Sequence, residues 1–271
     1  TFSPDNIKEV LDDIRKDKSV NNVLLYINSG GGSVTASEKI RNMLLNFKKE
    51  TGKTLTVSMN GLAASGAYWI STAADYVYAS PETITGSIGV FSLGISADKL
   101  LNEYGVYEDG VETSELARTS IAREMPQSQK IEYQLSVESI YKRFITIVRN
   151  AHPELQKVDY REFAEGRIFT VYDAKKLHLI NDIDTFDNLI ANAKKQIEKD
   201  KNTICKVKHF VPDGIDSHFI LKRMLSTHIQ GLVSDNTLKM LLSWFDTASV
   251  KGSNTQKTKI MATSAFTSID L

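Results

Sequence analysis

The chain has 271 residues, with 33 Lys and Arg against 33 Asp and Glu, so its formal net charge at neutral pH is zero. This balance gives no reason to expect nucleic acid or an anionic membrane surface as a partner. The sequence contains neither a run of about 18 apolar residues that would predict a membrane span nor a signal peptide. A single cysteine, Cys205, excludes an internal disulfide. The length allows one sizeable core and an appendage.

Strand and helix patterns alternate along the first part of the chain. An amphipathic helix is expected first, then continuous or alternating apolar runs of strand length separated by a glycine-rich loop and helices. In order, the expected elements are a helix over Asp5–Lys16, a strand at Val23–Ile27, a helix over Val34–Lys49, a strand at Thr54–Met59 that ends at Asn60-Gly61, a buried helix with Ala67–Ile70 and Ala73-Ala74, and strands at Tyr76–Ala79 and Ile88–Phe91. This alternation predicts an α/β fold with a mostly parallel sheet.

The second part of the chain is mainly helical in pattern. A long helix is predicted from Pro126 to Arg149, another lies within Ala174–Lys201, and Phe219–Phe245 carries amphipathic helices with exposed apolar positions. We therefore expect a main α/β domain over residues 1–200 and a helical extension over residues 201–271, polar from Ser249 to Lys259. Because Thr1 is not Met and no strand precedes the first helix, the chain is interpreted as a piece of a longer protein that lacks its first strand.

Ser65 stands at the point where a strand gives way to a helix, within a run of small residues. A hydroxyl there would be exposed near the positive end of the helix dipole and its unpaired N–H groups. Ser65 is therefore a candidate nucleophile. The alternative is that Ser65 only caps the helix, a role for which serine is well suited.

A glycine-rich loop, Gly30-Gly31-Gly32-Ser33, joins the first strand to the next helix. Glycines allow successive N–H groups to turn toward one point, so the loop is a candidate for donors that hold an oxyanion. A simple turn or an anion site remains the alternative. The spacing does not fit the G-x-G-x-x-G dinucleotide pattern, and the lysine of a P-loop is missing.

A serine nucleophile also needs a base. The histidines all lie well downstream of Ser65, and the nucleophile-elbow pattern G-x-S-x-G is broken by Ala63. His152 and His178 are expected to be solvated surface residues. A Ser–His–Asp arrangement stays possible with little support. The histidines are His152, His178, His209, His218 and His228.

Three sequence blocks resemble the SppA family of signal peptide peptidases. They are Asn28-Ser29-Gly30-Gly31-Gly32-Ser33-Val34, Ala63 to Ser71, and Ile84 to Gly89. The family patterns N-S-P-G-G-S-V, A-A-S-G-G-Y-W/Y-I-S and L-T-G-S-I-G occur in this order and at this spacing. Gly30 and Ala67 are mild departures, and the likeness covers roughly residues 5–192. The resemblance implies a fold of stacked ββα units, like that of ClpP and the crotonases, with a helical carboxy-terminal appendage.

The resemblance also implies roles for individual residues. Ser65 matches the nucleophile, Gly31 and Gly32 with Gly66 match the oxyanion-binding positions, and Ser87 matches a hydroxyl that orients a catalytic lysine; no cofactor or metal is implied. Here the segment Gly110–Arg123, where the family lysine is expected, contains no lysine. Arginine cannot replace it, because a guanidinium stays protonated. In tandem-duplicated family members the lysine comes from the amino-terminal half, and this chain resembles the carboxy-terminal half.

We therefore expect a serine endopeptidase that degrades residual signal peptides and other extended apolar segments. Its base would come from an amino-terminal half or a neighbouring protomer, in a homo-oligomer at the periplasmic side of a bacterial inner membrane. Two alternatives remain. The chain could be an inactive half used for assembly, or a crotonase-like enzyme acting on CoA thioesters, although the latter has no need of a serine at position 65.

Overall fold

The computed structural model describes residues 3–201, 204–210 and 259–264. The chain forms two compact units, one made of residues 1–86 and 168–271 and the other of residues 87–167. This division differs from the expected boundary near residue 200, because strands from both sides of that boundary join the first unit.

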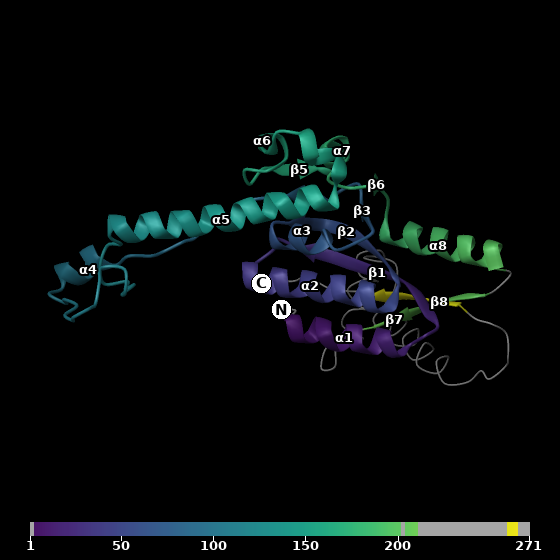
Figure 1. Ribbon diagram of the computed structural model, residues 1–271, viewed down its shortest axis with the longest axis horizontal. Coiled ribbons are helices and arrows are strands. Elements are labelled where there is room, and N and C mark those ends of the chain that lie inside the picture. Colours follow the sequence, from purple (N-terminus) through teal and green to yellow (C-terminus); the bar gives the residue numbers. More distant parts are fainter. Residues whose placement is uncertain (1–2, 202–203, 211–258, 265–271) are drawn as a thin grey trace, which may run out of the picture. The chain divides into compact units, whose positions relative to one another are not determined.

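The first unit is built on one sheet in which neighbouring strands are parallel, except for one antiparallel pair, β4 with β5. The strands run in the order β5-β4-β2-β1-β8-β7, and β3 pairs with both β2 and β6 (Figure 1). In the described residues they are β1 (Val20–Ser29), β2 (Thr54–Ala64), β3 (Tyr76–Ala79), β4 (Ile84–Gly86), β5 (Ile168–Thr170), β6 (Asp182–Ile183), β7 (Cys205–His209) and β8 (Lys259–Ser264). The predicted α/β class with a mostly parallel sheet is confirmed.

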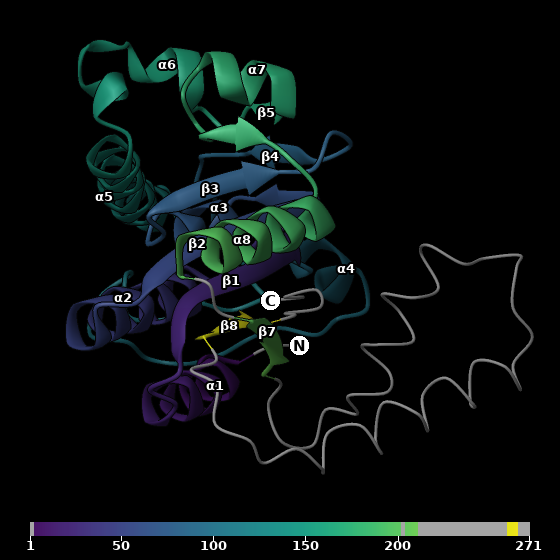
Figure 2. The same ribbon diagram turned by 90° about the vertical axis from the view of Figure 1, so that its right-hand side faces the viewer.

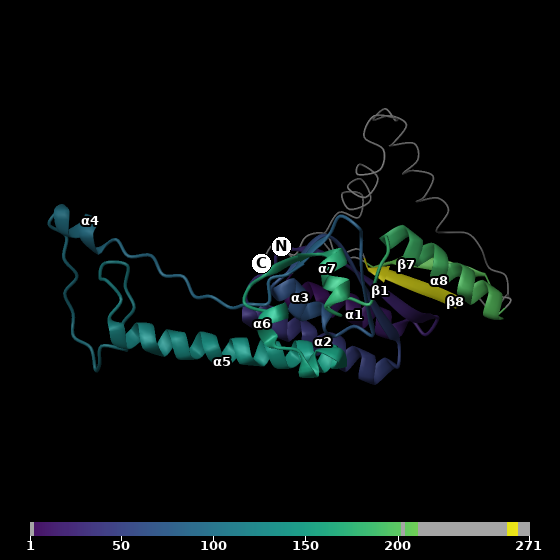
Figure 3. The ribbon, with the colours of Figure 1, turned by 90° about the horizontal axis from the view of Figure 1, so that it is seen from above.

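Helices cover both faces of this sheet. Figure 2 shows α3 behind the sheet and α8 in front of it. Side chains alternate along β1, so Leu25 and Ile27 face one side, whereas Tyr26 faces the other and meets the ring of Phe186 edge-on at 5.3 Å between centroids. In the top view α8 runs beside β7 and β8 (Figure 3). Within the described residues, the helices of this unit are α1 (Pro4–Lys16), α2 (Val34–Thr51), α3 (Gly66–Ser71), α7 (Val171–Lys176) and α8 (Phe186–Lys201).

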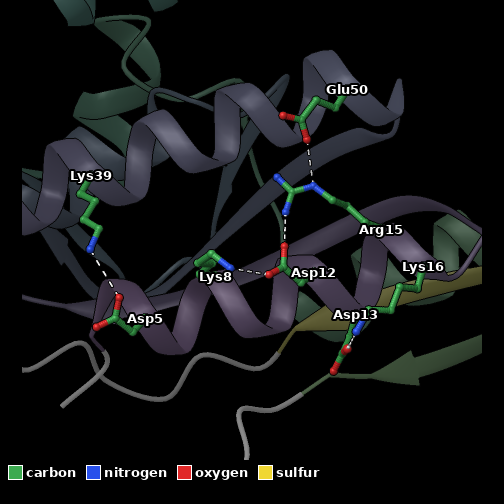
Figure 4. A network of polar contacts seen from close by, with 8 residues as sticks. All are labelled: Asp5, Lys8, Asp12, Asp13, Arg15, Lys16, Lys39 and Glu50. Atoms are coloured by element: carbon green, nitrogen blue, oxygen red, sulfur yellow. Dashed lines mark hydrogen bonds and ion pairs between the residues drawn. The ribbon is translucent and has the colours of Figure 1, made fainter.

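Helices α1 and α2 are joined by ion pairs along their exposed edges. Arg15 of α1 reaches Glu50 of α2 at 2.9 Å, and Lys39 of α2 reaches Asp5 of α1 at 3.4 Å (Figure 4). Such exposed pairs contribute little each. The stability of this layer comes instead from the fully buried apolar side chains on the same helices: Ile7, Val10, Leu11, Ile14, Ile40, Leu44 and Phe47.

The second unit is dominated by the long helix α5 (Gln127–Ala151). It also contains α4 (Asp98–Glu103), a 3₁₀ turn over Pro153–Lys157 and α6 (Tyr160–Phe163). The carboxy-terminal part of α5 is buried at Phe144, Ile147 and Val148, as its predicted apolar stripe requires. Toward the start of the helix the same stripe is about half exposed, at Ile131 (50%) and Leu135 (54%).

Several element boundaries differ from those expected. The strand β2 continues through Asn60-Gly61 to Ala64 because an irregularity in its pairing absorbs the turn-forming dipeptide. The predicted strand at Ile88–Phe91 is wrong: the strand of that region is β4, and the chain leaves the sheet at Ser87. Ala73-Ala74 lies beyond α3. The expected helices of Phe219–Phe245 lie outside the described residues.

Candidate active site

Ser65 occupies a sharp turn between β2 and α3. Its backbone has φ 54° and ψ −120°, a left-handed conformation that is strained for any residue except glycine. The turn is held from both sides: the Ser65 N–H donates to the Gly86 carbonyl and the Ser65 carbonyl accepts from the Trp69 N–H, each at 2.9 Å. Strain of this kind persists only where the surroundings impose it, and it is the backbone form of a strand-to-helix nucleophile turn.

The hydroxyl of Ser65 does not cap helix α3. The residue stands at the N-cap position, but its side chain accepts no hydrogen bond from the first turn of the helix. The residue is partly exposed, in contrast to α3, whose residues are all buried. The alternative interpretation of Ser65 as a helix cap is therefore wrong, and the hydroxyl is left available for chemistry.

The glycine loop after β1 lies directly against this turn. A Cβ atom on Gly31 would come within 2.5 Å of the Gly66 nitrogen and 2.9 Å of the Ser65 Cβ, so only glycine fits there. Gly31 has φ +99°, which also requires glycine. A Cβ on Gly66 would lie 3.0 Å from the Gly32 nitrogen. The structure thus brings together four of the predicted site residues, namely Gly31, Gly32, Ser65 and Gly66.

The N–H groups of this cluster are not equivalent. Gly31 donates its N–H to the Ser29 Oγ at 3.1 Å, in a buried position, so this group is already used. Among the described residues, neither the Gly32 N–H nor the Gly66 N–H donates a hydrogen bond. Two unused donors therefore flank Ser65, one from the residue that follows it and one from the neighbouring loop, as oxyanion holes require.

Helix α3 is anchored by two side-chain contacts that hold the turn in place. The Tyr68 hydroxyl donates to the Leu179 carbonyl at 2.7 Å, and burial raises the pKa of this phenol far above its ordinary value. The Trp69 Nε1–H donates to Glu38 Oε2 of α2 at 2.8 Å. Both rings are at least 98% buried, with 0% and 2% of their surface exposed. The predicted reading of this helix as buried core is confirmed.

Ser87 follows β4 and is the first residue of the second unit. It has φ 50°, and its N–H donates to the Arg167 carbonyl at 2.6 Å. The preceding residue, Gly86, is the one whose carbonyl accepts from Ser65. Backbone bonds on both sides of the Gly86–Ser87 peptide thus fix where the strand ends. The role of Ser87 in orienting a base stays a prediction.

Comparison with known proteins identifies the family. The family model described as "Peptidase family S49" matches residues 47–200, and the model "Clp protease" matches residues 6–85. The chain belongs to peptidase family S49. It is 43% identical over 182 residues to Protease 4 of Salmonella typhi, with 67% of this chain and 29% of that protein covered. Protease 4 of Haemophilus influenzae is 36% identical over 214 residues, covering 78% of this chain and 34% of that protein.

The chain is also similar to a protein of Enterococcus faecium named "Putative signal peptide peptidase SppA". It is 30% identical over 209 residues, with 77% of this chain and 60% of that protein covered. The chain therefore spans about a third of the length of the two Protease 4 relatives. The expected SppA-type family and the ClpP-like fold are both confirmed by these matches.

The segment in which the S49 resemblance places a lysine holds an arginine–glutamate cluster instead. Glu112 lies 2.8 Å from the Arg118 Nε and 2.9 Å from Arg123 Nη1, and Glu108 lies 3.4 Å from Arg118 Nη1. Arg123 also donates to the Glu115 carbonyl at 3.1 Å. Guanidinium groups engaged in this way offer no lone pair to a serine proton. This segment lies in the second unit and provides no base.

Among the described lysines, the one with a lowered pKa lies at the end of β2 opposite to Ser65. Partial burial lowers the pKa of Lys53, whose ammonium donates to the carbonyls of Asp17 and Val20. Lys53 precedes β2 and Ser65 follows it; at about 3.3 Å per residue, the 11-residue strand, shortened by its irregular segment, keeps them roughly 30 Å apart. Lys53 cannot take the Ser65 proton.

The histidines offer no better base among the described residues. His152 is only 7% exposed, so the expectation that it is solvated is wrong; His178 is exposed as expected. His209 of β7 pairs with Thr263, which pairs with Leu24 near the middle of β1, far from the end of the sheet that carries Ser65. No hydrogen bond joins a described lysine or histidine side chain to Ser65.

The described residues contain no group of three or more His, Cys, Asp and Glu side chains arranged to hold a metal ion. In the same part of the chain, no helix has the length and apolar character needed to cross a membrane.

Sequence reasoning assigned no role to Asn28 and Ser29 beyond membership of a matching block. In the structure both make side-chain contacts to the backbone of the site: the Leu62 N–H donates to Asn28 Oδ1 at 3.3 Å, and the Gly31 N–H donates to Ser29. The signal for such contacts in the sequence was the position of two short polar residues at the end of an apolar strand.

Proposed function

We propose that this chain is the serine-bearing half of an SppA-type peptidase, in which Ser65 attacks a peptide carbonyl. The observation that carries the proposal is the strained, uncapped turn at Ser65 with the Gly31-Gly32 loop packed against it. Membership of peptidase family S49 supports it. In the reaction, the Ser65 Oγ would form a bond to the carbonyl carbon while its proton passes to a base. The base would give that proton to the leaving amine as the C–N bond breaks, and water would then hydrolyse the acyl ester on Ser65.

The oxyanion formed in that attack would be held by the N–H groups of Gly32 and Gly66. Neither donor has an acceptor in the described residues, and one oxyanion donor is typically worth about 2.7–4 kcal/mol of transition-state stabilisation. Gly31 contributes differently: its lack of a side chain allows the loop to approach the turn, while its own N–H is bonded to Ser29.

The general base in this proposal is a lysine from outside the chain, oriented in part by the Ser87 hydroxyl. The support is chemical: a serine nucleophile needs a base, and no described lysine or histidine side chain forms a hydrogen bond with Ser65. A lysine works as a base only when desolvation lowers its pKa, which a partner surface closing over the site would do. An amino-terminal half or a neighbouring protomer of a homo-oligomer is the proposed source.

The proposed substrates are cleaved signal peptides and similar extended apolar segments. The support is the resemblance to SppA proteins and the name of the Enterococcus faecium relative. By the same resemblance, we place the assembled enzyme at the bacterial inner membrane, facing the periplasm.

Peptide turnover by the protein in its native assembly tests the proposal. Replacing Ser65 with Ala should abolish hydrolysis of a fluorogenic apolar peptide without changing the melting temperature. Ser71→Ala is the matched control, because Ser71 is a buried serine whose hydroxyl donates to the Tyr68 carbonyl at 2.7 Å within the same helix. Near wild-type turnover by the Ser65→Ala protein would refute the assignment of the nucleophile.

A further inference from the structure

The strands β1 and β2 pair irregularly just before the site. Ile27 pairs with Met59 and Ser29 pairs with Ala63, so a single β1 residue, Asn28, faces three residues of β2. Bulges of this type bend a strand and re-aim the residues that follow. Here the bulge ends two residues before Ser65, so its shape decides where the nucleophile turn begins.

Asn28 supports this bulge through its side chain. Leu62 pairs with Ile84 of β4 but has no partner in β1, and its N–H donates to Asn28 Oδ1 at 3.3 Å. Gly61 lies against the side-chain amide of Asn28. It has φ +70°, and a Cβ there would lie 3.3 Å from Asn28 Oδ1. The Asn28 side chain thus joins β1 to β2 within the irregular segment, and it fixes the path of β2 into the turn.

Ser29 does the same for the glycine loop. It is 4% exposed, and its Oγ accepts the Gly31 N–H at 3.1 Å. This bond orients the Gly31 peptide and leaves the next N–H, that of Gly32, on the side of Gly66. Successive side chains of a strand point to opposite faces, so Asn28 and Ser29 reach the two sides of β1 from adjacent positions.

We propose that Asn28 and Ser29 are a pair of positioning residues that set the alignment of the Ser65 turn with the Gly31-Gly32 loop. Each accepts one backbone N–H, Asn28 from the segment that leads into the nucleophile and Ser29 from the segment that carries the oxyanion donor. Neither touches the reacting atoms. The inference rests on the proposed function for its catalytic consequence, whereas the two contacts themselves do not depend on it.

The contacts can be tested by amide hydrogen exchange on the folded chain. Ser29→Ala should speed exchange of the Gly31 N–H, and Asn28→Ala that of the Leu62 N–H, each by about tenfold or more because a protecting bond is lost. Asn42→Ala serves as a control, since Asn42 bonds Glu38 on the exposed side of α2. Unchanged exchange at both amides would overturn the inference even if the enzyme proves to be a peptidase.

The catalytic consequence is tested by turnover in the native assembly. Misalignment of a catalytic group by about 1 Å can cost 10²-fold, so Ser29→Ala and Asn28→Ala should lower kcat by between about tenfold and a hundredfold. KM should stay within about twofold, because misalignment of Ser65 and the oxyanion donors weakens contacts made in the transition state. Ser29→Thr keeps the oxygen acceptor and should restore kcat, as should Asn28→Asp, and these variants remain informative if an alanine variant fails to fold.

The possible failures are distinguishable. If Ser65→Ala keeps full turnover, the proposed function fails while the exchange experiment still decides the contacts. If Ser65→Ala is inactive but Ser29→Ala and Asn28→Ala keep kcat within about twofold of the unmodified protein, the positioning role is refuted. A fall in kcat that Ser29→Thr fails to restore would also contradict the role assigned to the hydroxyl.

Discussion

Gly31→Ala is the substitution that most directly probes the contact between the glycine loop and the Ser65 turn. The new Cβ would lie 2.5 Å from the Gly66 nitrogen, 2.7 Å from the Ala64 oxygen and 2.9 Å from the Ser65 Cβ. All three neighbours belong to the backbone or lie next to it, so none can move aside cheaply. We expect the loop and the turn to be pushed apart.

The expected loss of unfolding free energy in Gly31→Ala has two parts, backbone strain and overpacking, and the Gly52→Ala variant separates them. Both glycines have positive φ, which costs an alanine roughly 1–2 kcal/mol, but a Cβ on Gly52 meets nothing within 4 Å. Overpacking at Gly31 adds about 1–3 kcal/mol to that shared strain. In urea unfolding, Gly31→Ala should therefore lower the free energy of unfolding by about 1–3 kcal/mol more than Gly52→Ala. Equal destabilisation by the two variants would refute the argued contact.

Three further predictions follow from the site and its surroundings. Ser65→Gly should be more stable than Ser65→Ala by up to about 2 kcal/mol in thermal unfolding, because relief of about 1–3 kcal/mol of strain outweighs the greater entropy of glycine; equal stability would contradict the strain. The hydrogen bond from Lys208, helped by Ser19, lowers the pKa of Asp17 from 3.8 to about 2. The resulting stability is complete above pH about 4 and is lost as the pH falls toward 2; it amounts to no more than about 1 kcal/mol, because Lys208 is 43% exposed. In the Lys208→Ala variant, the unfolding free energy should depend less on pH between about 4 and 2, whereas Lys206→Ala should keep the original dependence. The same pH dependence in both variants would contradict the contribution of the Lys208–Asp17 ion pair. The isolated chain should show no Ser65-dependent turnover of a fluorogenic peptide; robust turnover would mean that a base within the chain exists.

The elements closest to the site could be predicted from the sequence because local patterns determine them. The apolar run Val23–Ile27 lies inside β1, and the helix predicted from Val34 begins at that residue in α2, where Ser33 accepts the Ala36 N–H as a cap. The position of Ser65 between a strand and a helix followed from the same patterns. Its uncapped side chain did not, since sequence alone cannot decide between a cap and a nucleophile.

The predictions from sequence fail where contacts with distant residues override a local sequence pattern. Asn60-Gly61 is a strong turn signal, yet β2 passes through it because Asn28 of another strand supports the bulge. Ile88–Phe91 has strand-forming side chains, but the backbone turns at Ser87 with φ 50° and leaves the sheet. The strands β7 and β8 pair with each other and with β1 across long stretches of sequence, which no short-range pattern encodes.

The parallel arrangement of the strands explains why the predicted site residues lie together. The strands β1 and β2 are parallel, as are β2 and β4, so the residues that follow them emerge at the same edge of the sheet. That edge receives the glycine loop after β1, Ser65 after β2 and Ser87 after β4. Further along the chain, the segment in which the family resemblance places the lysine carries Arg118 and Arg123, both paired with Glu112.

A serine placed in this way is a weak nucleophile until its proton has an acceptor. Among the described lysines, the one with a lowered pKa is Lys53, roughly 30 Å away at the opposite end of the 11-residue strand β2. Under the proposed function, the geometry of attack is built into this chain, whereas the protonation chemistry is supplied on assembly. Control of proteolysis would then rest on assembly, because the partner that brings the lysine also excludes the water that keeps a lysine protonated.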